Sequence, residues 1–248
     1  MRIAIHQPQF LPWLGYLDKI DQVDLFVILD NVQFKKNEWQ NRNRIRTAQG
    51  CQWLTVPVLH RFGQRVNEVC INQTSDWSSK HLHALEMHYS RAAHRDRVLE
   101  GLRPIYRRPW RSLASLNLAV LEWLLATFGI KTPLRLASEM TLRDEPTDRL
   151  IDICRTVGAT HYLAGAGAPG YMDVPRFEAS GLTLEIQDFR SPVYAQCYEP
   201  FVPGLAAIDL LLTCGNDALR LLRETRPSPL AQDSLSHVRE ASGLIDSE

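Results

Sequence analysis

The sequence predicts an α/β fold, and three features of its hydrophobic pattern lead to that prediction. A strand-like segment near the amino terminus is followed by helical periodicity and then by a second apolar run, DLFVIL. The same alternation returns after residue 134, and a mainly helical stretch, 77–130, lies between the two. Apolar strands that alternate with helices are typical of parallel sheets covered on both faces. We therefore expect a Rossmann-like layered parallel sheet with a helical insertion.

The first βαβ unit is expected within residues 2–29. Residues 2–6 have strand composition, and residues 24–29 form a short apolar run bounded by acidic residues, as in a strand buried on both faces. Between them, Pro12 is suited to a first helical turn. The apolar residues after it have helical spacing: Trp13, Tyr16, Leu17 and Ile20.

The next segments are more polar. Residues 30–50 indicate a polar loop with room for a strand at its end. Residues 52–58 and 65–71 are β-like and would form a hairpin around Gly63. Asp76 is suited to cap a helix that begins at Trp77, and two or three helices would fill 77–130.

The second half repeats the pattern of strand and helix and ends in a polar tail. The expected elements are a strand at 134–138, a helix at 147–157, a strand at 161–164, a Gly-rich turn at 165–173, a strand at 183–186 and a helix at 206–213. Residues 1–225 would form a single α/β domain. Residues 226–248 carry Pro, Ser and charge without periodicity, which predicts a flexible C-terminal tail.

Composition narrows the functional class. The chain has 248 residues, of which 45% are hydrophobic and 23% charged, so disorder and coiled coil are excluded for most of it. Lys and Arg number 28, as do Asp and Glu, which leaves no overall field to steer the protein onto nucleic acid or an anionic membrane. A nucleic-acid partner is therefore not expected, and any basic site must be local.

Cysteine usage and hydropathy predict a cytoplasmic protein. The five cysteines are widely spaced without a C-x-x-C pair, which is typical of a reducing compartment and argues against a metal site. Residues 1–7 lack the apolar core of a signal peptide. The most apolar window, 113–130, contains Asn117 and Glu122 and predicts a buried helix, so we expect no membrane span.

The first candidate site is the segment HQPQFLPWLGYLDK, residues 6–19, where the first strand meets the first helix. In open α/β sheets ligands bind at the carboxyl ends of strands. His6 there is a candidate acid/base group or anion donor, with Gln7 as a substrate contact. Trp13 and Tyr16 would contact substrate as well. The alternative is that His6 is bonded into a loop and that the aromatic residues belong to the core.

Four segments together resemble the WbqC-like family: HQPQFLPWLGYLDKI, DLFVILDNVQFKKNEWQNRNRI, WLTVPV and YLAGAGAPGYMD. The resemblance extends over roughly residues 3–215 and is most specific in the first 60. It implies a link to bacterial surface-polysaccharide (O-antigen) biosynthesis and a glycine-transferase role. At the level of fold alone, the start of the chain is similar to nucleotidylyltransferase-like enzymes such as pantothenate synthetases, but Gly15 and Tyr16 stand where those enzymes carry a second histidine.

The second candidate site is the loop DNVQFKKNEWQNRNR, residues 30–44, which follows the second strand. Asp30 is its candidate base. The side chains expected to orient substrate or neutralise negative charge are Gln33, Lys35, Lys36, Trp39, Asn41 and Arg42. The alternative is a solvated charged loop. A single-stranded nucleic-acid groove would also combine Arg and Trp, but the balanced charge and the absence of an RNP-like motif argue against it.

Weaker signals lie further along the chain. His81 in the stretch SSKHLHALEMH is a possible substrate contact or a half-buried histidine, and the spacing of this stretch is not that of a zinc site. Gly165 and Tyr171 belong to the turn GAGAPGYMD, which would let backbone amides approach a ligand. The literal G-x-G-x-x-G there has Pro169 where a dinucleotide-binding helix should begin, so no cofactor is assigned.

The family resemblance, together with these candidate residues, implies a group-transfer enzyme that moves an aminoacyl or acyl unit to an amino sugar or similar amine, in glycan or secondary-product assembly. The substrate would be a small molecule such as a sugar nucleotide or an activated amino acid. Two alternatives stay open: a non-catalytic binding protein for a nucleotide-sugar or carrier-linked intermediate, and an ATP-dependent nucleotidylyltransferase-like ligase. The central spatial expectation is that His6 and the loop after the second strand line a common hollow.

Overall fold

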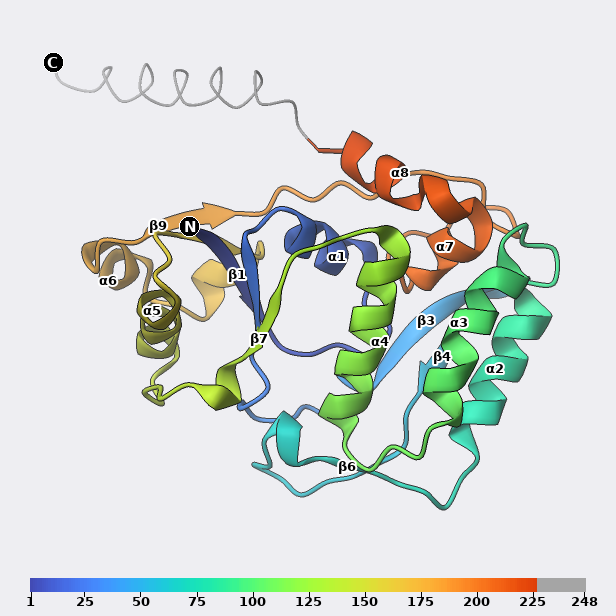
Figure 1. Ribbon diagram of the computed structural model, residues 1–248, viewed down its shortest axis with the longest axis horizontal. Helices are drawn as coiled ribbons and strands as arrows, with labels where there is room; N and C mark the ends of the chain where they lie inside the picture. Colours follow the sequence, from blue (N-terminus) through green and yellow to red (C-terminus); the bar gives the residue numbers. More distant parts are fainter. Residues whose placement is uncertain (227–248) are drawn as a thin grey trace, which may run out of the picture.

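A five-stranded parallel sheet forms the centre of the computed structural model, which describes residues 1–226 (Figure 1). Its strands lie in the order β7-β2-β1-β8-β9. Their bounds are β1 Arg2–His6, β2 Leu25–Ile28, β7 Leu134–Leu136, β8 His161–Ala164 and β9 Thr183–Ile186. All four neighbouring pairs are parallel, so the predicted Rossmann-like layered sheet is confirmed.

The strand order creates a switch point at the centre of the sheet. From β1 the chain moves outward through β2 to β7, then crosses back through α5 (Pro146–Val157) to β8 on the other side of β1. Connections therefore leave β1 and β8 in opposite directions. In doubly wound folds, the crevice above the carboxyl ends of two such strands is where ligands bind.

Helices cover both faces of the sheet because its strand residues alternate between two cores. Ala4, Phe26 and Ile28 pack with α1 (Leu14–Asp21) on one face. Ile3, Ile5 and Val27 pack with α5 and α6 (Val174–Ala179) on the other. This two-sided burial explains why β1 and β2 consist of continuous apolar runs.

The insertion between β2 and β7 contains three helices and two short antiparallel sheets, seen to the right of the central sheet in Figure 1. The helices are α2 Trp77–His88, α3 Arg95–Arg107 and α4 Leu113–Phe128; the strands are β3 Arg42–Thr47, β4 Gly50–Thr55, β5 Val58–Leu59 and β6 Cys70–Ile71. Asp76 accepts a hydrogen bond from the Ser79 backbone N–H, which confirms the predicted helix cap.

The prediction of a hairpin around Gly63 was wrong in its main pairing. Only Val58, the last residue of the segment 52–58, pairs with the segment 65–71, through Ile71, and Leu59 just beyond it pairs with Cys70. Most of the first segment instead pairs with β3, inside the stretch expected to be largely loop. Polar and basic residues dominate β3, so it lacks the apolar alternation that marks a strand.

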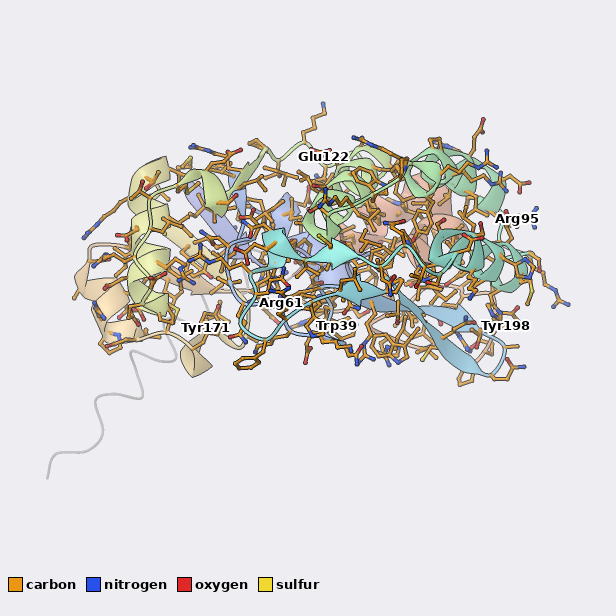
Figure 2. All side chains as sticks on the ribbon, turned by 90° about the horizontal axis from the view of Figure 1, so that it is seen from below. Trp39, Arg61, Arg95, Glu122, Tyr171 and Tyr198 are labelled. Atoms are coloured by element: carbon orange, nitrogen blue, oxygen red, sulfur yellow. The ribbon has the colours of Figure 1, made fainter. Side chains whose placement is uncertain are left out.

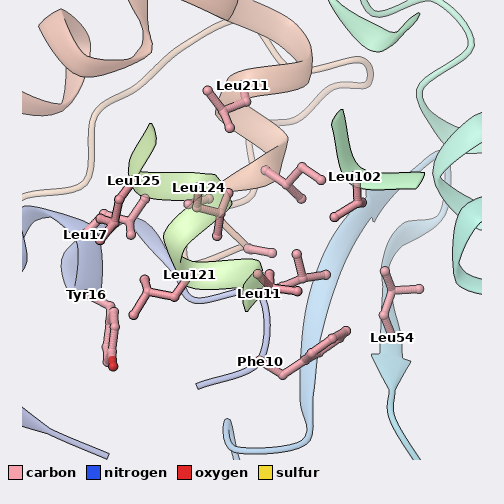
Figure 3. Packing of buried hydrophobic residues seen from close by; sticks show 14 of the residues in the cluster. Phe10, Leu11, Tyr16, Leu17, Leu54, Leu102, Leu121, Leu124, Leu125 and Leu211 are labelled. Atoms are coloured by element: carbon pink, nitrogen blue, oxygen red, sulfur yellow. The ribbon is translucent and has the colours of Figure 1, made fainter. Parts of the chain in front are cut away.

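The apolar window at 113–130 is the buried helix α4 together with its cap. Figure 3 shows Leu121, Leu124 and Leu125 of α4 against Leu17 and Leu211, which come from distant parts of the chain. None of the helices described within residues 1–226 has the length and apolarity needed to cross a membrane.

The carboxyl-terminal elements close the α1 face with α7 (Ile208–Cys214) and α8 (Ala218–Glu224). The predicted flexible tail, 226–248, lies outside the described residues except for Arg226. The Arg226 guanidinium donates to Asp18 and Asp21 of α1 at 2.7 and 2.6 Å. Each of the five cysteines is free.

Candidate functional site

A cavity of about 400 Å³ lies at the switch point. Ile5, Leu150 and Tyr162 give it apolar walls, and His6, Gln7 and Arg149 are among its polar groups. The elements that form it are the carboxyl end of β1, the first turns of α5 and the turn after β8, which supplies Tyr171. The sheet topology therefore places a mixed polar and apolar cavity where doubly wound proteins bind ligands.

Two smaller hollows share walls with this cavity. One of about 200 Å³ is lined by His6 and Gln7 together with Gln9, Lys35, Glu38, Trp39 and Gln40. The other, of about 230 Å³, shares Arg149 with the main cavity and adds Arg65, Asn31, Asn67 and Ser138. We call the three together the His6 groove. Figure 2 shows Tyr171, Arg61 and Trp39 along one side of the molecule.

The His6 imidazole is neutral at physiological pH. Its pKa is lowered to about 4, first by burial and then by the positive charge of Lys19, while a hydrogen bond to the Gln7 carbonyl opposes the shift. His6 Nδ1 lies 3.1 Å from that carbonyl oxygen, which can only accept. Nδ1 therefore carries the proton and Nε2 has a free lone pair, which makes His6 a proton acceptor in the groove.

Hydrogen bonds hold both the backbone carbonyl and the side chain of Gln7 in place. Its backbone carbonyl also accepts from the Tyr16 hydroxyl at 3.1 Å, and the Tyr16 ring packs edge-on against His6. Its side-chain Oε1 accepts from Gln40 Nε2 at 2.5 Å, and Gln40 is in turn bonded to the Lys35 backbone N–H. The Gln7 amide N–H groups are thereby left to face a ligand.

Lys19 is a buried lysine that the sequence analysis did not identify. It is only 4% exposed, and burial lowers its pKa to about 8 against the opposing effect of Asp18. The Lys19 Nζ lies beside Gly165. A Cβ atom on residue 165 would lie only 3.0 Å from this Nζ. A lysine near the end of a short helix carries no special signal in the sequence, so only the fold reveals this charge beside His6.

Arg65 and Arg149 were also missed; they line the third hollow together with the Asp144 carboxylate. Arg149 is bonded to the carbonyls of Arg143 and Asp144 and to the exposed Asp144 carboxylate. Arg65 forms no ion pair within residues 1–226. The two arginines come from segments about eighty residues apart, so no local motif joins them.

Five of the predicted site residues line the groove. They are His6, Gln7, Lys35, Trp39 and Tyr171. The structure thus brings the first strand's end and the loop after the second strand to a common hollow, as the sequence analysis expected.

Asp30 lies elsewhere. Its buried carboxylate accepts from the Ser138 backbone N–H at 2.9 Å and from the Ser138 hydroxyl at 2.7 Å. It lines a hollow of about 120 Å³ with Pro8, Asn67 and Leu136, and Asn67 also lines the hollow that contains Arg65 and Arg149. Its contacts join the end of β2 to the segment after β7, and its predicted role as a base stays a prediction.

Several other predicted residues support the groove from behind. Tyr16 is buried beneath His6, and Asn41 is buried with its amide bonded to the Val56 carbonyl at 3.0 Å. Trp13 packs edge-on against Phe189, away from the lining of the groove. These side chains shape the site through packing.

The remaining predicted residues lie outside the groove lining. Gln33 and Lys36 are exposed, and Arg42 stacks on Trp53 at 4.1 Å. His81 is buried in the insertion, where it is bonded to the Thr55 carbonyl. Burial lowers the pKa of His81 to about 4, so it is a neutral core histidine.

Within residues 1–226, no three His, Cys, Asp or Glu side chains gather as metal ligands would. The polar groups of the groove are instead one imidazole, amides, a lysine, two arginines and two carboxylates, Glu38 and Asp144. Such groups hold and orient anionic or hydroxylated ligands and accept a proton.

Fold and groove together define a Rossmann-like α/β protein with a cavity at its switch point. The chain belongs to the WbqC-like protein family, whose family model matches residues 7–221. It is also 38% identical over 229 residues to the uncharacterized protein Rv1507c of Mycobacterium tuberculosis (strain ATCC 25618 / H37Rv), a match that covers 91% of this chain and 99% of that protein. No solved structure matches the chain. The family predicted from the sequence motifs is thus confirmed.

Proposed function

We propose that this protein is a group-transfer enzyme that moves an aminoacyl or acyl unit, with glycine as the first candidate, to an amino sugar or similar amine. The proposal places its reactions in surface-polysaccharide or secondary-product biosynthesis in the cytoplasm. The observation that carries it is a neutral imidazole, His6, that lines both the main cavity, which Arg149 also lines, and the smaller hollow that contains Lys35. A transfer reaction needs such an arrangement because it must hold two substrates on either side of one proton acceptor.

Each of the two smaller hollows binds one of the two substrates. Arg65 and Arg149 bind the anionic part of the activated acyl donor, such as an acyl phosphate or a carrier phosphate. Lys35 and Trp39 bind the acceptor on the other side of His6. The apolar walls of the main cavity exclude water from the reactive acyl group.

The chemical step is an acyl transfer. The acceptor amine attacks the donor carbonyl, which forms a C–N bond and gives a tetrahedral intermediate with a cationic nitrogen. His6 Nε2 takes the proton from that nitrogen. The C–O or C–S bond to the leaving group then breaks, and His6 passes the proton to the leaving group. The free amide N–H groups of Gln7 hydrogen-bond to the carbonyl oxygen as it becomes negative.

The test incubates the full chain with UDP- and dTDP-linked amino sugars and two donor systems, glycine with ATP and a preformed glycyl thioester. Mass spectrometry reads the expected product, the acceptor with one added glycyl unit. His6→Asn should reduce turnover by about 100-fold or more, a common contribution of a general base, and leave substrate affinity within a few-fold. His81→Asn is the matched control, since it removes a second buried neutral imidazole that lies outside the groove.

Other results would favour the two alternatives. Tight binding of the sugar nucleotide by wild type with no product from either donor would favour a binding protein. Exchange of labelled pyrophosphate into ATP at substrate saturation would favour the nucleotidylyltransferase-like ligase. Full activity in His6→Asn would overturn the assignment of His6.

A further inference from the structure

We propose that a partly exposed surface next to the groove, formed by Trp39, Arg42, Arg44 and Trp53, binds the nucleoside diphosphate part of the acceptor. We call this surface the tryptophan platform. The inference rests on the proposed function, because it identifies the handle by which the acceptor sugar is presented to His6.

The β3–β4 hairpin builds the platform. Arg42 and Arg44 are two residues apart on β3, so they share one face, and Arg44 pairs directly with Trp53 on β4. The Arg42 and Arg44 guanidinium carbons lie 4.1 and 5.6 Å from the centroid of the Trp53 ring. The Trp39 ring lies 5.7 Å from the Trp53 ring at a tilt of 46°. Two aromatic rings and two cations thus form one contiguous surface.

Exposure and charge indicate that this surface takes a ligand. Trp39 is 36% exposed and Trp53 is 41% exposed, although tryptophan is among the most buried residue types on average. Neither Arg42 nor Arg44 forms an ion pair with any residue in 1–226. The Nε atoms of both arginines are buried without a hydrogen-bond partner in that range. The platform therefore offers aromatic surface together with two guanidinium groups that no carboxylate in residues 1–226 pairs with.

The position of Trp39 links the platform to the catalytic groove. Trp39 and Lys35 line the same 200 Å³ hollow as His6 and Gln7. A nucleobase stacked on the platform would bring a diphosphate to Lys35 and the arginines, and the attached sugar to His6. Stacking recognises the base, and guanidinium groups recognise phosphate.

The same features argue against other ligands. A neutral glycan would use the aromatic rings but not the unpaired cations. A nucleic-acid chain would need a longer basic track, whereas the protein carries equal numbers of basic and acidic residues. A nucleoside diphosphate fits because it combines one flat ring with two phosphates.

The test measures binding of UDP, dTDP, uridine and inorganic pyrophosphate to the full chain by calorimetry and by tryptophan fluorescence. UDP or dTDP should bind at least about tenfold more tightly than uridine or pyrophosphate, since stacking and ionic contacts both contribute. Trp53→Ala, and Arg42→Gln combined with Arg44→Gln, should each weaken nucleotide binding by about tenfold or more. Trp53→Phe should restore part of the affinity because it keeps an aromatic face.

Arg108→Gln is the matched control, because Arg108 stacks on Trp110 at 4.4 Å, in the helical insertion away from the groove lining. It should bind nucleotides as wild type does. Equal affinity for UDP and pyrophosphate, or wild-type affinity in Trp53→Ala, would overturn the platform. Tighter binding of oligothymidylate than of dTDP would overturn it in favour of a nucleic-acid groove.

The outcomes also separate this inference from the proposed function. Nucleotide binding that depends on the platform, without transfer activity, would leave the inference standing and refute the proposed transfer. Transfer that depends on His6, with an unchanged KM for the acceptor in Trp53→Ala, would support the proposed transfer and refute the tryptophan platform.

Discussion

Acidification should destabilise this protein through two buried imidazoles, those of His6 and His81. The pKa of each is lowered from the ordinary value of 6.5 to about 4, mainly because burial disfavours the charged form. Between these two values the unfolded chain binds protons that the folded protein does not. The stability that depends on the neutral imidazoles is therefore complete above about pH 6.5 and is lost as the pH falls toward 4.

The size of the effect follows from the pKa shift. A drop from 6.5 to about 4 corresponds to about 3 kcal/mol of unfolding free energy per imidazole once the pH is below both values. At pH 5 about 2 kcal/mol per imidazole is already lost. The two contributions should add, because His81 lies in the insertion and does not line the groove that contains His6.

Urea unfolding at about pH 7.5 and about pH 5 measures this loss in wild type, His6→Asn and His81→Asn. Each variant should lose about 2 kcal/mol less than wild type between the two pH values, whatever its absolute stability. His83→Asn, which replaces an exposed histidine two residues further along α2, should lose as much as wild type. The same pH dependence in all four proteins would refute the claim that these imidazoles are held neutral by burial.

Two further substitutions test the structural contacts described above. Asp30→Asn should lower the unfolding free energy by about 1–2 kcal/mol, because the carboxylate accepts two hydrogen bonds from Ser138, and should leave the transfer rate within a few-fold of wild type. A large loss of turnover at unchanged stability would instead make Asp30 catalytic. Leu124→Ala should cost about 2–5 kcal/mol in urea unfolding because the side chain is completely buried in the larger core. An unchanged midpoint would contradict that packing.

The sequence by itself determined the central sheet. The strands at 2–6, 24–29 and 161–164 and the helix at 147–157 were predicted to within a few residues. A strand that is buried on both faces gives a continuous apolar run, and a helix that is buried on one face gives apolar residues at helical spacing, so both can be recognised in the local sequence. The rule that ligands bind at the carboxyl ends of parallel strands then placed His6 and Lys35 in one hollow.

Tertiary structure decided which side chains complete the site. Arg65 and Arg149 meet at one hollow only because α5 crosses back over the sheet. Asp30 also follows a central strand, yet its carboxylate is taken up by Ser138. Lys19 is buried beside His6 because the turn after β8 packs against α1. Periodicity records whether a residue is buried, but the partner that a polar group finds depends on how distant segments pack, and a single sequence carries no local trace of that.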